Sequence, residues 1–421
     1  MNQTARIISI YAADTSGVCS ALYEYGGMTV IHDASGCNST YTTHDEPRWY
    51  DKKSMMFISG LTEKDAVMGN DDRFMEDLIV AANELKPAFI ALCASPLPAM
   101  IGTDLEAIAY AVETETGIPS FAVKTNGMQS YITGAGNAFL ELAKKFANSD
   151  ENELCQPTSN PYVFNAQALK LMFGTKLPTA VSANTDNDFP KPQEDTFKKI
   201  KVNLLGVAPL DYPTKESMDS LLKFIKESGF ELNACVGVDT NLYEFKNIKK
   251  GEVNLLLSSC GKPLADYLFS EYKIPFVKGV PYGLGFSDKI KEALIKACES
   301  KENIDATEGF REAGNVAILG ESIMSASLAS ALLLDKGIKA NVLETVGDGD
   351  FEILKPFDIS CDDEKILENE LKKYDVVIGD PLFKPICADK KFIELPHEAF
   401  SGRCFTKNAP NLIYTSIDKF I

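Results

Sequence analysis

Residues 28–50, MTVIHDASGCNSTYTTHDEPRWY, contain the turn that decides how we interpret the chain. They open with the β-branched run Thr29–Ile31, which predicts a short strand. The pattern breaks at His32–Gly36, and Cys37 follows directly. A strand that ends in a Gly-Cys turn places a thiol at the carboxyl edge of a sheet, where open α/β proteins bind ligands and cofactors. Gly36 lets a cluster or ligand approach the backbone because glycine has no Cβ atom.

Strand and helix patterns alternate along the first 150 residues. Residues 71–85 carry apolar side chains at helical spacing. Residues 88–93, AFIALC, form an apolar run that is typical of a fully buried strand. A helix is expected at 104–116, a further strand at 120–123 and a further helix at 135–146. This β-α-β-α order predicts a parallel sheet with right-handed crossovers.

The same alternation returns twice more in the chain. We therefore expect an α/β protein with three consecutive Rossmann-like, doubly wound domains, each with a parallel sheet. The expected domains are residues 1–150, which hold the cluster-binding segment, 200–306 and 307–421. Residues 151–199 are rich in Asn, Asp, Pro and Lys, and we expect a linker or an insertion there. A cleft between such domains is a usual place for a ligand.

Composition narrows the classes of function. The chain has 421 residues and a formal net charge of −18, which argues against nucleic acid and anionic membranes as partners. No run of about 20 apolar residues predicts a membrane span, and the first residues do not read as a signal peptide. Ten cysteines without short regular spacing favour a reducing cytoplasm over a disulfide scaffold.

Four cysteines are candidate ligands. Cys37 and Cys260 share one setting, because each follows a predicted strand and stands beside a glycine. A thiolate there is a strong ligand for an iron-sulfur cluster, and backbone N–H groups of the turn tune such a cluster. The alternative is a buried cysteine that acts as a small hydrophobe. That structural interpretation is favoured for Cys19, on a predicted helix, and for Cys93, inside an apolar strand.

The three histidines are candidates for proton transfer or metal binding. His32 and His44 flank Cys37, and His397 stands in a Pro-His-Glu turn near the C-terminus. The alternative for each is a hydrogen-bonded loop histidine. The fragment Gly134–Gly136 resembles part of a phosphate-binding loop, but it does not directly follow a strand pattern. The chain has no G-x-x-x-x-G-K-[ST] motif, so we do not expect it to hydrolyse ATP itself.

Several short motifs, in order, resemble the nitrogenase component 1 family. That family comprises nitrogenase catalytic subunits, cofactor-assembly scaffolds, and the dark-operative protochlorophyllide reductase with its tetrapyrrole-reducing relatives. Residues 32–37 resemble the family's His-Gly-x-x-Gly-Cys turn, which supplies a thiolate to the P-cluster or its simpler [4Fe-4S] equivalent. Residues 61–69 and 101–105 resemble two further family segments. Residues 254–260 and 395–402 resemble the regions that carry a cofactor cysteine and a cofactor histidine in true nitrogenases.

The resemblance implies a redox mechanism. A separate ATP-hydrolysing iron-sulfur protein would deliver low-potential electrons to a [4Fe-4S]-type cluster. Cys37 would hold this cluster beside Gly36, with Cys19 and Cys93 as substitutes for family cysteines that do not align. The cluster would lie at the interface of a homodimer, or of a heterodimer with a sister chain.

The same resemblance places the chemistry elsewhere in the chain. A small-molecule substrate, or a second metallocluster held by Cys260, would lie between the domains near His397. His397 and His32 are the candidate catalytic residues, although His397 stands about one residue out of the family register.

Two other interpretations stay open. One is a non-enzymatic scaffold that assembles or carries a metallocluster, because the same fold and cysteines serve both roles. The other is a metal-free α/β binding protein, because some family cysteines are missing. True dinitrogen reduction is not expected, since the set of cluster ligands is incomplete.

Overall fold

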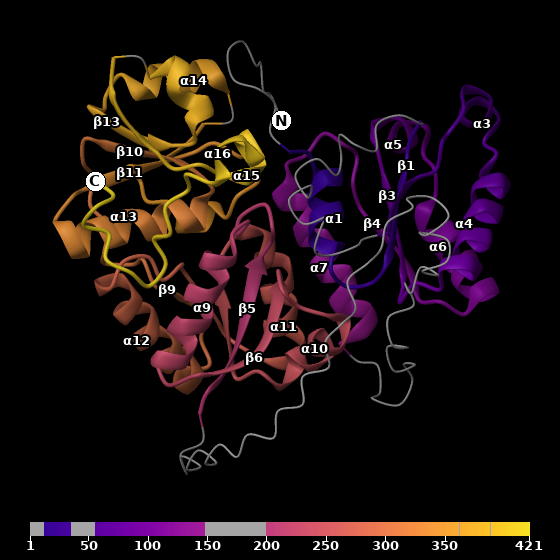
Figure 1. Cartoon of the computed structure of the whole chain (residues 1–421), viewed down its shortest axis with the longest axis horizontal. Coiled ribbons are helices and arrows are strands. Elements are labelled where there is room, and N and C mark those ends of the chain that lie inside the picture. Colours follow the sequence, from indigo (N-terminus) through magenta and orange to yellow (C-terminus); the bar gives the residue numbers. More distant parts are fainter. Residues whose placement is uncertain (1–11, 35–54, 148–198, 362, 388) are drawn as a thin grey trace, which may run out of the picture. The chain divides into compact units, whose positions relative to one another are not determined.

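The computed structural model describes residues 12–34, 55–147, 199–361, 363–387 and 389–421. Gly36, Cys37 and His44 lie outside the described residues, as does all of the predicted 151–199 segment except its last residue. The domain boundaries given above therefore stay predictions. What the structure does describe is three separate parallel sheets with helices between their strands (Figure 1).

The first sheet has the strand order β2-β1-β3-β4, and every pairing is parallel. Its strands are β1 (Met28–His32), β2 (Met55–Ile58), β3 (Ile90–Ala94) and β4 (Ser120–Val123). Its helices are α1 (Asp14–Leu22), α3 (Glu63–Met68), α4 (Asp71–Leu85), α5 (Pro96–Ile101), α6 (Leu105–Thr116) and α7 (Tyr131–Phe146). All residues of β1 and β3 are buried, as their continuous apolar sequence predicts.

The second sheet has the order β6-β5-β7-β8-β9, again parallel throughout. Its strands are β5 (Lys201–Val207), β6 (Glu231–Gly237), β7 (Val253–Leu256), β8 (Phe276–Lys278) and β9 (Ile304–Asp305). Its helices are α9 (Lys215–Glu227), α10 (Leu242–Lys246), α11 (Lys262–Tyr272) and α12 (Gly285–Ser300), with the 3₁₀ turns η2 (Asn247–Lys250) and η3 (Ser259–Gly261).

The third sheet has the order β12-β11-β10-β13-β14, also parallel. Its strands are β10 (Val316–Gly320), β11 (Ala340–Glu344), β12 (Ile359–Ser360), β13 (Val376–Gly379) and β14 (Lys391–Glu394). Its helices are α13 (Ser322–Lys336), α14 (Glu364–Leu371), α15 (Glu398–Ser401) and α16 (Arg403–Thr406), with the 3₁₀ turns η4 (Phe351–Ile353) and η5 (Pro381–Ile386).

The strand orders locate the places where ligands bind in such sheets. In the second sheet the chain winds outward in both directions from β5, and in the third from β10. In each of these sheets, the loops that follow the two central strands turn to opposite sides of the sheet. A crevice opens between them at the carboxyl edge. The predicted fold class, parallel α/β units of the doubly wound type, is confirmed by this topology.

The local predictions near Cys260 and Gly134 need correction. The strand predicted over residues 254–260 ends at Leu256, and Cys260 lies in the 3₁₀ turn η3. Gly134–Gly136 does not open a helix, because α7 already begins at Tyr131. A Cβ atom on Gly134 would stand 1.8 Å from the carbonyl oxygen of Asp14, so this glycine allows α7 to pack directly on α1.

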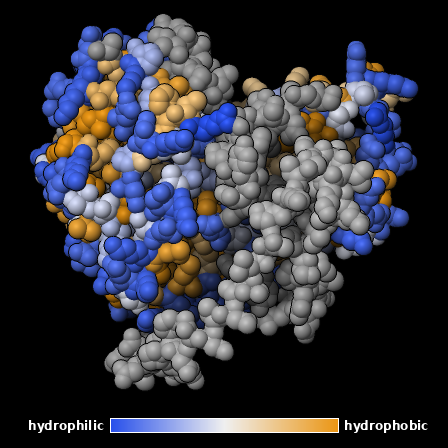
Figure 2. Space-filling view, viewed as in Figure 1, coloured by the Kyte–Doolittle hydropathy of each residue, from blue (hydrophilic) through white to orange (hydrophobic). Residues whose placement is uncertain are grey.

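The surface adds one negative observation. No described helix is both long and apolar enough to span a membrane. On the face shown in Figure 2, hydrophilic residues dominate, and hydrophobic residues stand in small groups between them. Scattered apolar residues of this kind are normal on folded proteins.

Candidate functional site

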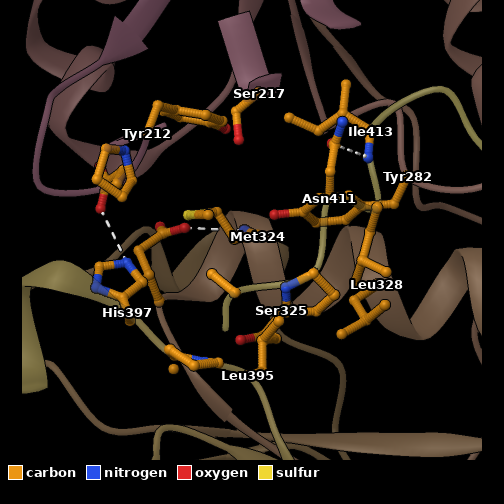
Figure 3. A pocket seen from close by; sticks show the side chains of 18 of the residues that line it. Tyr212, Ser217, Tyr282, Met324, Ser325, Leu328, Leu395, His397, Asn411 and Ile413 are labelled. Atoms are coloured by element: carbon orange, nitrogen blue, oxygen red, sulfur yellow. Dashed lines mark hydrogen bonds and ion pairs between the residues drawn. The ribbon is translucent and has the colours of Figure 1, made fainter. Parts of the chain in front are cut away.

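A pocket lies at the carboxyl ends of the second and third sheets. Its walls come from the segment after β5, the start of α13, the segment after β14 and the chain near residues 409–413. Its cavity volume is about 80 Å³, and it opens to solvent. The side chains around it are mainly apolar, with a few polar groups between them (Figure 3). This combination is typical of small-molecule sites.

Asp211 is the centre of the polar groups beside the pocket. Its side chain is fully buried, and four other side chains contact its two oxygens. The Tyr131 hydroxyl donates to Oδ1 at 2.6 Å, and the Ser258 hydroxyl donates to Oδ2 at 2.6 Å. The Cys260 thiol donates to Oδ2 at 3.6 Å, and His397 Nε2 lies 3.2 Å from Oδ1. The structure thus brings the predicted residues Cys260 and His397 to one carboxylate.

A glycine explains how the chain reaches this arrangement. Gly206, near the end of β5, has a φ of 77°. A Cβ atom there would stand 2.7 Å from the carbonyl oxygen of Ser258. The bare backbone lets the end of β5 approach the turn that holds Ser258 and Cys260, which places both side chains within reach of Asp211.

His397 caps the short helix α15 with its side chain. The backbone N–H of Ala399 donates to Nδ1 at 3.3 Å, so we assign the proton of the neutral ring to Nε2, which faces Asp211. The 3.2 Å contact has the distance of an ion pair but not the alignment of a hydrogen bond, and Nε2 has no hydrogen-bond partner within the described structure. The backbone N–H of His397 donates to Asp380 Oδ2 at 2.8 Å, which fixes the turn.

Opposing effects set the protonation of this histidine. Burial alone would lower the pKa of His397. The carboxylates of Asp211, Asp380 and Glu321 outweigh burial and raise the pKa above the usual 6.5. Because of this balance, the ring keeps a proton to a higher pH than a free histidine does.

Glu321 follows β10 directly and caps helix α13. Its carboxylate accepts N–H groups of Ile323 at 3.0 Å and Met324 at 2.8 Å. It also accepts the backbone N–H of Ser259 at 3.1 Å and a short hydrogen bond from the Ser259 hydroxyl. Burial raises the pKa of Glu321, and the charge of Asp211 raises it further. Glu321, like His397, therefore keeps its proton to a higher pH than a free side chain does, and both residues line the same pocket.

Cys260 is held as a thiol in this structure. Its side chain is fully buried in η3 and does not line the pocket wall. Burial and the neighbouring Asp211 raise the pKa of Cys260 well above the usual value for a thiol. No group of three or more His, Cys, Asp or Glu side chains within the described residues is arranged to hold a metal ion. The metal role of Cys260 and the second metallocluster stay predictions.

His32 lies at the first sheet, away from the pocket that His397 lines. It is the last residue of β1, where Nδ1 lies 2.8 Å from the Ser59 hydroxyl and the ring stacks on Phe74 with centroids 4.3 Å apart. Burial lowers the pKa of His32, so the ring is neutral near pH 7. A smaller hollow beside it is lined by His32, Phe74 and Arg73, among others. The structure does not bring the two candidate catalytic histidines into one site.

The candidate cluster cysteines fall partly outside the described residues. Cys93 stands in β3 opposite Ile31 of β1, one residue before the strand ends, and Cys19 is in α1, which packs on β3. Both are buried, and burial together with Asp14 raises the pKa of the Cys93 thiol. Cys37 follows the described end of β1 by a few residues. The roles of Cys37, Cys19, Cys93 and Gly36 stay predictions.

Sequence reasoning missed Asp211, Glu321 and Tyr131. Each acid is one among 60 Asp and Glu residues, and neither belongs to a recognisable motif. Their position in the sequence could have indicated them, because Asp211 and Glu321 each come shortly after the first strand of a predicted sheet, at the edge where ligands bind. Tyr131 belongs to α7, and only the tertiary structure brings it to a carboxylate 80 positions further on.

Comparison with known proteins identifies the family. A model described as nitrogenase component 1 type oxidoreductase matches residues 17–341. Among curated proteins, a nitrogenase molybdenum-iron protein beta chain of Nostoc sp. is 30% identical over 166 residues, covering 37% of this chain and 32% of the relative. The nitrogenase iron-molybdenum cofactor biosynthesis protein NifE of Sinorhizobium fredii is 22% identical, covering 60% and 43%. The matches therefore span less than half of either relative.

Another relative and a solved structure agree with this result. One of the subunits of the light-independent protochlorophyllide reductase of Chlorobium phaeobacteroides is 27% identical over 93 residues, which are 22% of this chain and 18% of that protein. The solved structure of nitrogenase Cp1 at pH 6.5 has a TM-score of 0.64 and 16% identity, covering 99% of this chain and 91% of that one. This likeness shows the fold. The family match over most of the length shows that the chain belongs to the nitrogenase component 1 type oxidoreductases.

Proposed function

We propose that the chain is a subunit of a nitrogenase-like reductase that uses low-potential electrons to reduce a small substrate. The observation that carries this proposal is the pocket at the carboxyl ends of the second and third sheets. Most side chains that line this pocket are apolar. Three ionisable side chains, those of His397, Glu321 and Asp211, also line it. A reduction consumes protons as well as electrons, and these side chains supply places that hold protons beside a bound molecule.

The electrons would enter at the first sheet. Cys37 would hold a [4Fe-4S]-type cluster just beyond β1, with Cys19 or Cys93 as a further ligand from the same sheet or the helix that packs on it. The position fits, because the carboxyl edge of a parallel sheet accepts such groups. When bound, the cluster would supply a one-electron relay. Cys93 is a buried neutral thiol in this structure, so it would have to lose its proton on binding iron.

The polar side chains of the pocket would act on the substrate. His397 and Glu321 line the cavity, and the pKa of each is raised, so each holds a proton to a higher pH than a free side chain. Asp211 orients His397 from 3.2 Å and fixes Tyr131 through a 2.6 Å hydrogen bond. The apolar walls exclude water and keep these interactions strong.

The proposal also concerns partners. The sequence has no P-loop, so the ATP-dependent electron donor would be a separate iron-sulfur protein. The cluster would be completed across an interface with a second copy or with a sister chain, because few candidate cysteines gather at the first sheet. We place the assembled protein in the cytoplasm, where cysteines stay reduced.

A scaffold for metallocluster assembly is the second candidate. The observation that favours it is the meeting of Cys260 and His397 on the two oxygens of Asp211. A thiol and an imidazole on one carboxylate would become a ligand pair if a cluster displaced their protons. The reductase would turn over many substrate molecules per chain, whereas the scaffold would hand over a single cluster.

The first experiment measures iron, acid-labile sulfide and the EPR spectrum of the anaerobically prepared, reduced protein, alone and with any sister chain. We expect a cluster in the wild type and in the control Cys298→Ala, whose thiol lies on α12 beside the second sheet. We expect Cys37→Ala to lose it. A wild-type assembly without iron and sulfide would disprove the redox proposal, and a cluster that survives Cys37→Ala would move its site toward Cys260.

A second experiment separates the reductase from the scaffold. The cluster-loaded protein receives electrons from an ATP-dependent iron-sulfur donor, and consumption of electrons is followed over time. Electron consumption that continues beyond one reducing equivalent per cluster supports the reductase. Release of intact cluster to an acceptor protein, without sustained electron consumption, supports the scaffold.

A further inference from the structure

We propose that a row of polar side chains carries protons from solvent to Glu321, and from there to a molecule bound in the pocket. The path leads from Ser360 through Glu344 and Ser322 to Glu321. This inference rests on the proposed function, because a reduction in the pocket would consume the protons that the path delivers. It gives a role to Glu344 and Ser322, neither of which lines the pocket.

Glu321 lines the pocket but is closed off from bulk water. The residue is 1% exposed, and the apolar side chains of Leu319, Met324 and Leu328 line the same wall. A molecule bound in the pocket would also cover the mouth. A proton that Glu321 gives to such a molecule would therefore be replaced from inside the protein, through groups within hydrogen-bonding reach.

Two buried serine hydroxyls contact the carboxyl group of Glu321. The Ser259 hydroxyl donates a short hydrogen bond to Oε1, and Ser322 Oγ lies 3.2 Å from the same oxygen. The two hydroxyl oxygens are 3.0 Å apart, and both serines are buried. Because a hydroxyl both donates and accepts, it can pass one proton on as it receives another.

Glu344, the last residue of β11, is the next ionisable group along the path. It stands opposite Gly320 of β10, the residue before Glu321, and it is fully buried. Burial raises the pKa of Glu344 to about 7, and the charge of Glu321 contributes to the rise. A carboxyl group with this pKa gains and loses a proton readily near neutral pH, as a relay group needs to do.

Gly349 keeps a side chain out of the space between Ser322 and Glu344. A Cβ atom on this glycine would stand 2.8 Å from Ser322 Oγ and 3.3 Å from Glu344 Oε1. The two oxygens therefore flank one point. Rotation of the Ser322 side chain, or one bridging water, would complete the transfer between them.

Ser360 connects the path to solvent. Its hydroxyl donates to Glu344 Oε2 at 3.3 Å, and the residue is exposed. It belongs to β12, which is the edge strand of the third sheet. The buried carboxyl group of Glu344 is thus hydrogen-bonded to a side chain that water can reach.

Other titratable groups near the path are held by other partners. In the loop after β11, Asp348 accepts a backbone N–H at the start of α7 at 2.6 Å, and Asp350 pairs with Lys278 at 2.6 Å. On the β12 side, Cys361 donates its backbone N–H to the carbonyl of Glu344 at 2.6 Å. The two aspartates therefore serve contacts between units, which leaves Glu344 and Glu321 as the acids that face Ser322.

One proton enters the path for each proton that the substrate takes up. When electrons reach the bound molecule, the O–H bond of Glu321 breaks and a bond from that hydrogen to the substrate forms. Ser322 gives its proton to the Glu321 carboxylate and receives one from Glu344. Solvent beside Ser360 returns a proton to Glu344. The electrons come from the separate iron-sulfur donor of the proposed function, so the path itself changes no oxidation state.

The test follows exchange of the Glu321 carboxyl proton in the full-length protein without an electron donor. Infrared spectroscopy at mildly acidic pH records the carbonyl stretch of protonated carboxyl groups, and the band that Glu321→Gln removes is assigned to Glu321. After transfer to heavy water, this band shifts as deuterium replaces the proton. We expect Ser322→Ala and Glu344→Gln each to slow the shift by about ten-fold or more, because each interrupts the path.

Ser330→Ala is the matched control. Ser330 is a buried serine of the same helix, and its hydroxyl donates to the backbone carbonyl of Ala326 at 3.0 Å. We expect this variant to exchange at the wild-type rate. Exchange that stays unchanged in both Ser322→Ala and Glu344→Gln would overturn the proposal. Equal slowing in the control, or a Glu321 without a protonated band at mildly acidic pH, would overturn it as well.

A second readout uses the protein with its cluster and electron donor. Glu344→Gln should slow electron consumption, and a small diffusible acid such as imidazolium should restore part of the rate, because it brings protons to the pocket by another way. A merely structural role of Glu344 would show no such rescue. Loss of rate without rescue therefore contradicts the proposed path.

The two proposals fail in distinguishable ways. Exchange at Glu321 that depends on Ser322 and Glu344, in a protein without iron or sulfide, keeps the proton path and loses the redox function. Sustained electron consumption in a protein whose Glu321 exchanges independently of these residues keeps the reductase and loses this inference.

Discussion

Asp211 shows how one buried side chain organises the site at the scale of the residue. Its two oxygens contact a tyrosine, a serine, a cysteine and a histidine from three segments of the chain. We expect Asp211→Asn to lower the free energy of unfolding by about 1–3 kcal/mol, because an amide cannot accept from every one of these donors. Urea denaturation followed by circular dichroism measures this change. The exposed Asp219→Asn in α9 is the control, and equal stability of both variants would show that the network contributes little.

Glu344 gives a prediction for the pH dependence of stability. Burial raises its pKa to about 7, against 4.5 for a free glutamate, and the N–H groups of Val346 and Gly347 offset only part of this. Below pH 4.5 the carboxyl is protonated in both the folded and the unfolded state. Between pH 4.5 and 7 the folded state binds more protons, so the free energy of unfolding falls as pH rises, by roughly 3 kcal/mol in total.

The matched variant isolates this contribution. Glu344→Gln cannot titrate, so the difference in stability between wild type and variant should change across this window and level off above pH 7. Denaturation curves at half-unit steps from pH 4 to 8 measure it. A difference that stays constant with pH would mean that Glu344 titrates normally.

At the scale of the element, the contact between α1 and α7 depends on glycine. A Cβ atom on Gly134 would overlap the backbone of Asp14, and neither backbone can move without separating the helices. We therefore expect Gly134→Ala to destabilise the protein by about 1–3 kcal/mol, although alanine favours helix formation. Thermal unfolding compares this variant with Lys144→Ala, an exposed position of the same helix. A Gly134→Ala variant as stable as that control would contradict the packing described here.

The accuracy of the sequence predictions followed the strength of local patterns. Strands β1 and β3 were predicted within two residues, because fully buried strands are continuous apolar runs. The start of α7 was missed because glycines usually mark loops, whereas the role of Gly134 is close packing. Cys260 was selected because it follows a predicted strand beside a glycine, and His397 because it stands in a Pro-His-Glu turn; the family motifs support both. Asp211 was not, since its importance comes only from contacts between segments far apart in sequence.

At the scale of the whole molecule, the start of α7 links the first sheet's unit to the pocket. The Tyr131 hydroxyl donates to Asp211 Oδ1 at 2.6 Å, and the neighbouring N–H of Ser130 donates to Asp348 Oδ2, also at 2.6 Å. Asp14 anchors the preceding loop by accepting the N–H of Gly127 at 2.9 Å. One helix end is therefore hydrogen-bonded to both of the other α/β units.

These links predict how the three units unfold together. If α7 couples the units, the double variant Tyr131→Phe, Asp348→Ala should lose about 1–3 kcal/mol of the free energy that couples their unfolding, because one buried and one partly buried hydrogen bond are removed. Calorimetry should then show a broader or divided transition, while Lys144→Ala keeps the wild-type shape. A single sharp transition in the double variant would mean that apolar packing, rather than these hydrogen bonds, carries the coupling. Either result bears on the proposed reaction, in which electrons would enter at the first sheet and would be used where Asp211 and His397 meet.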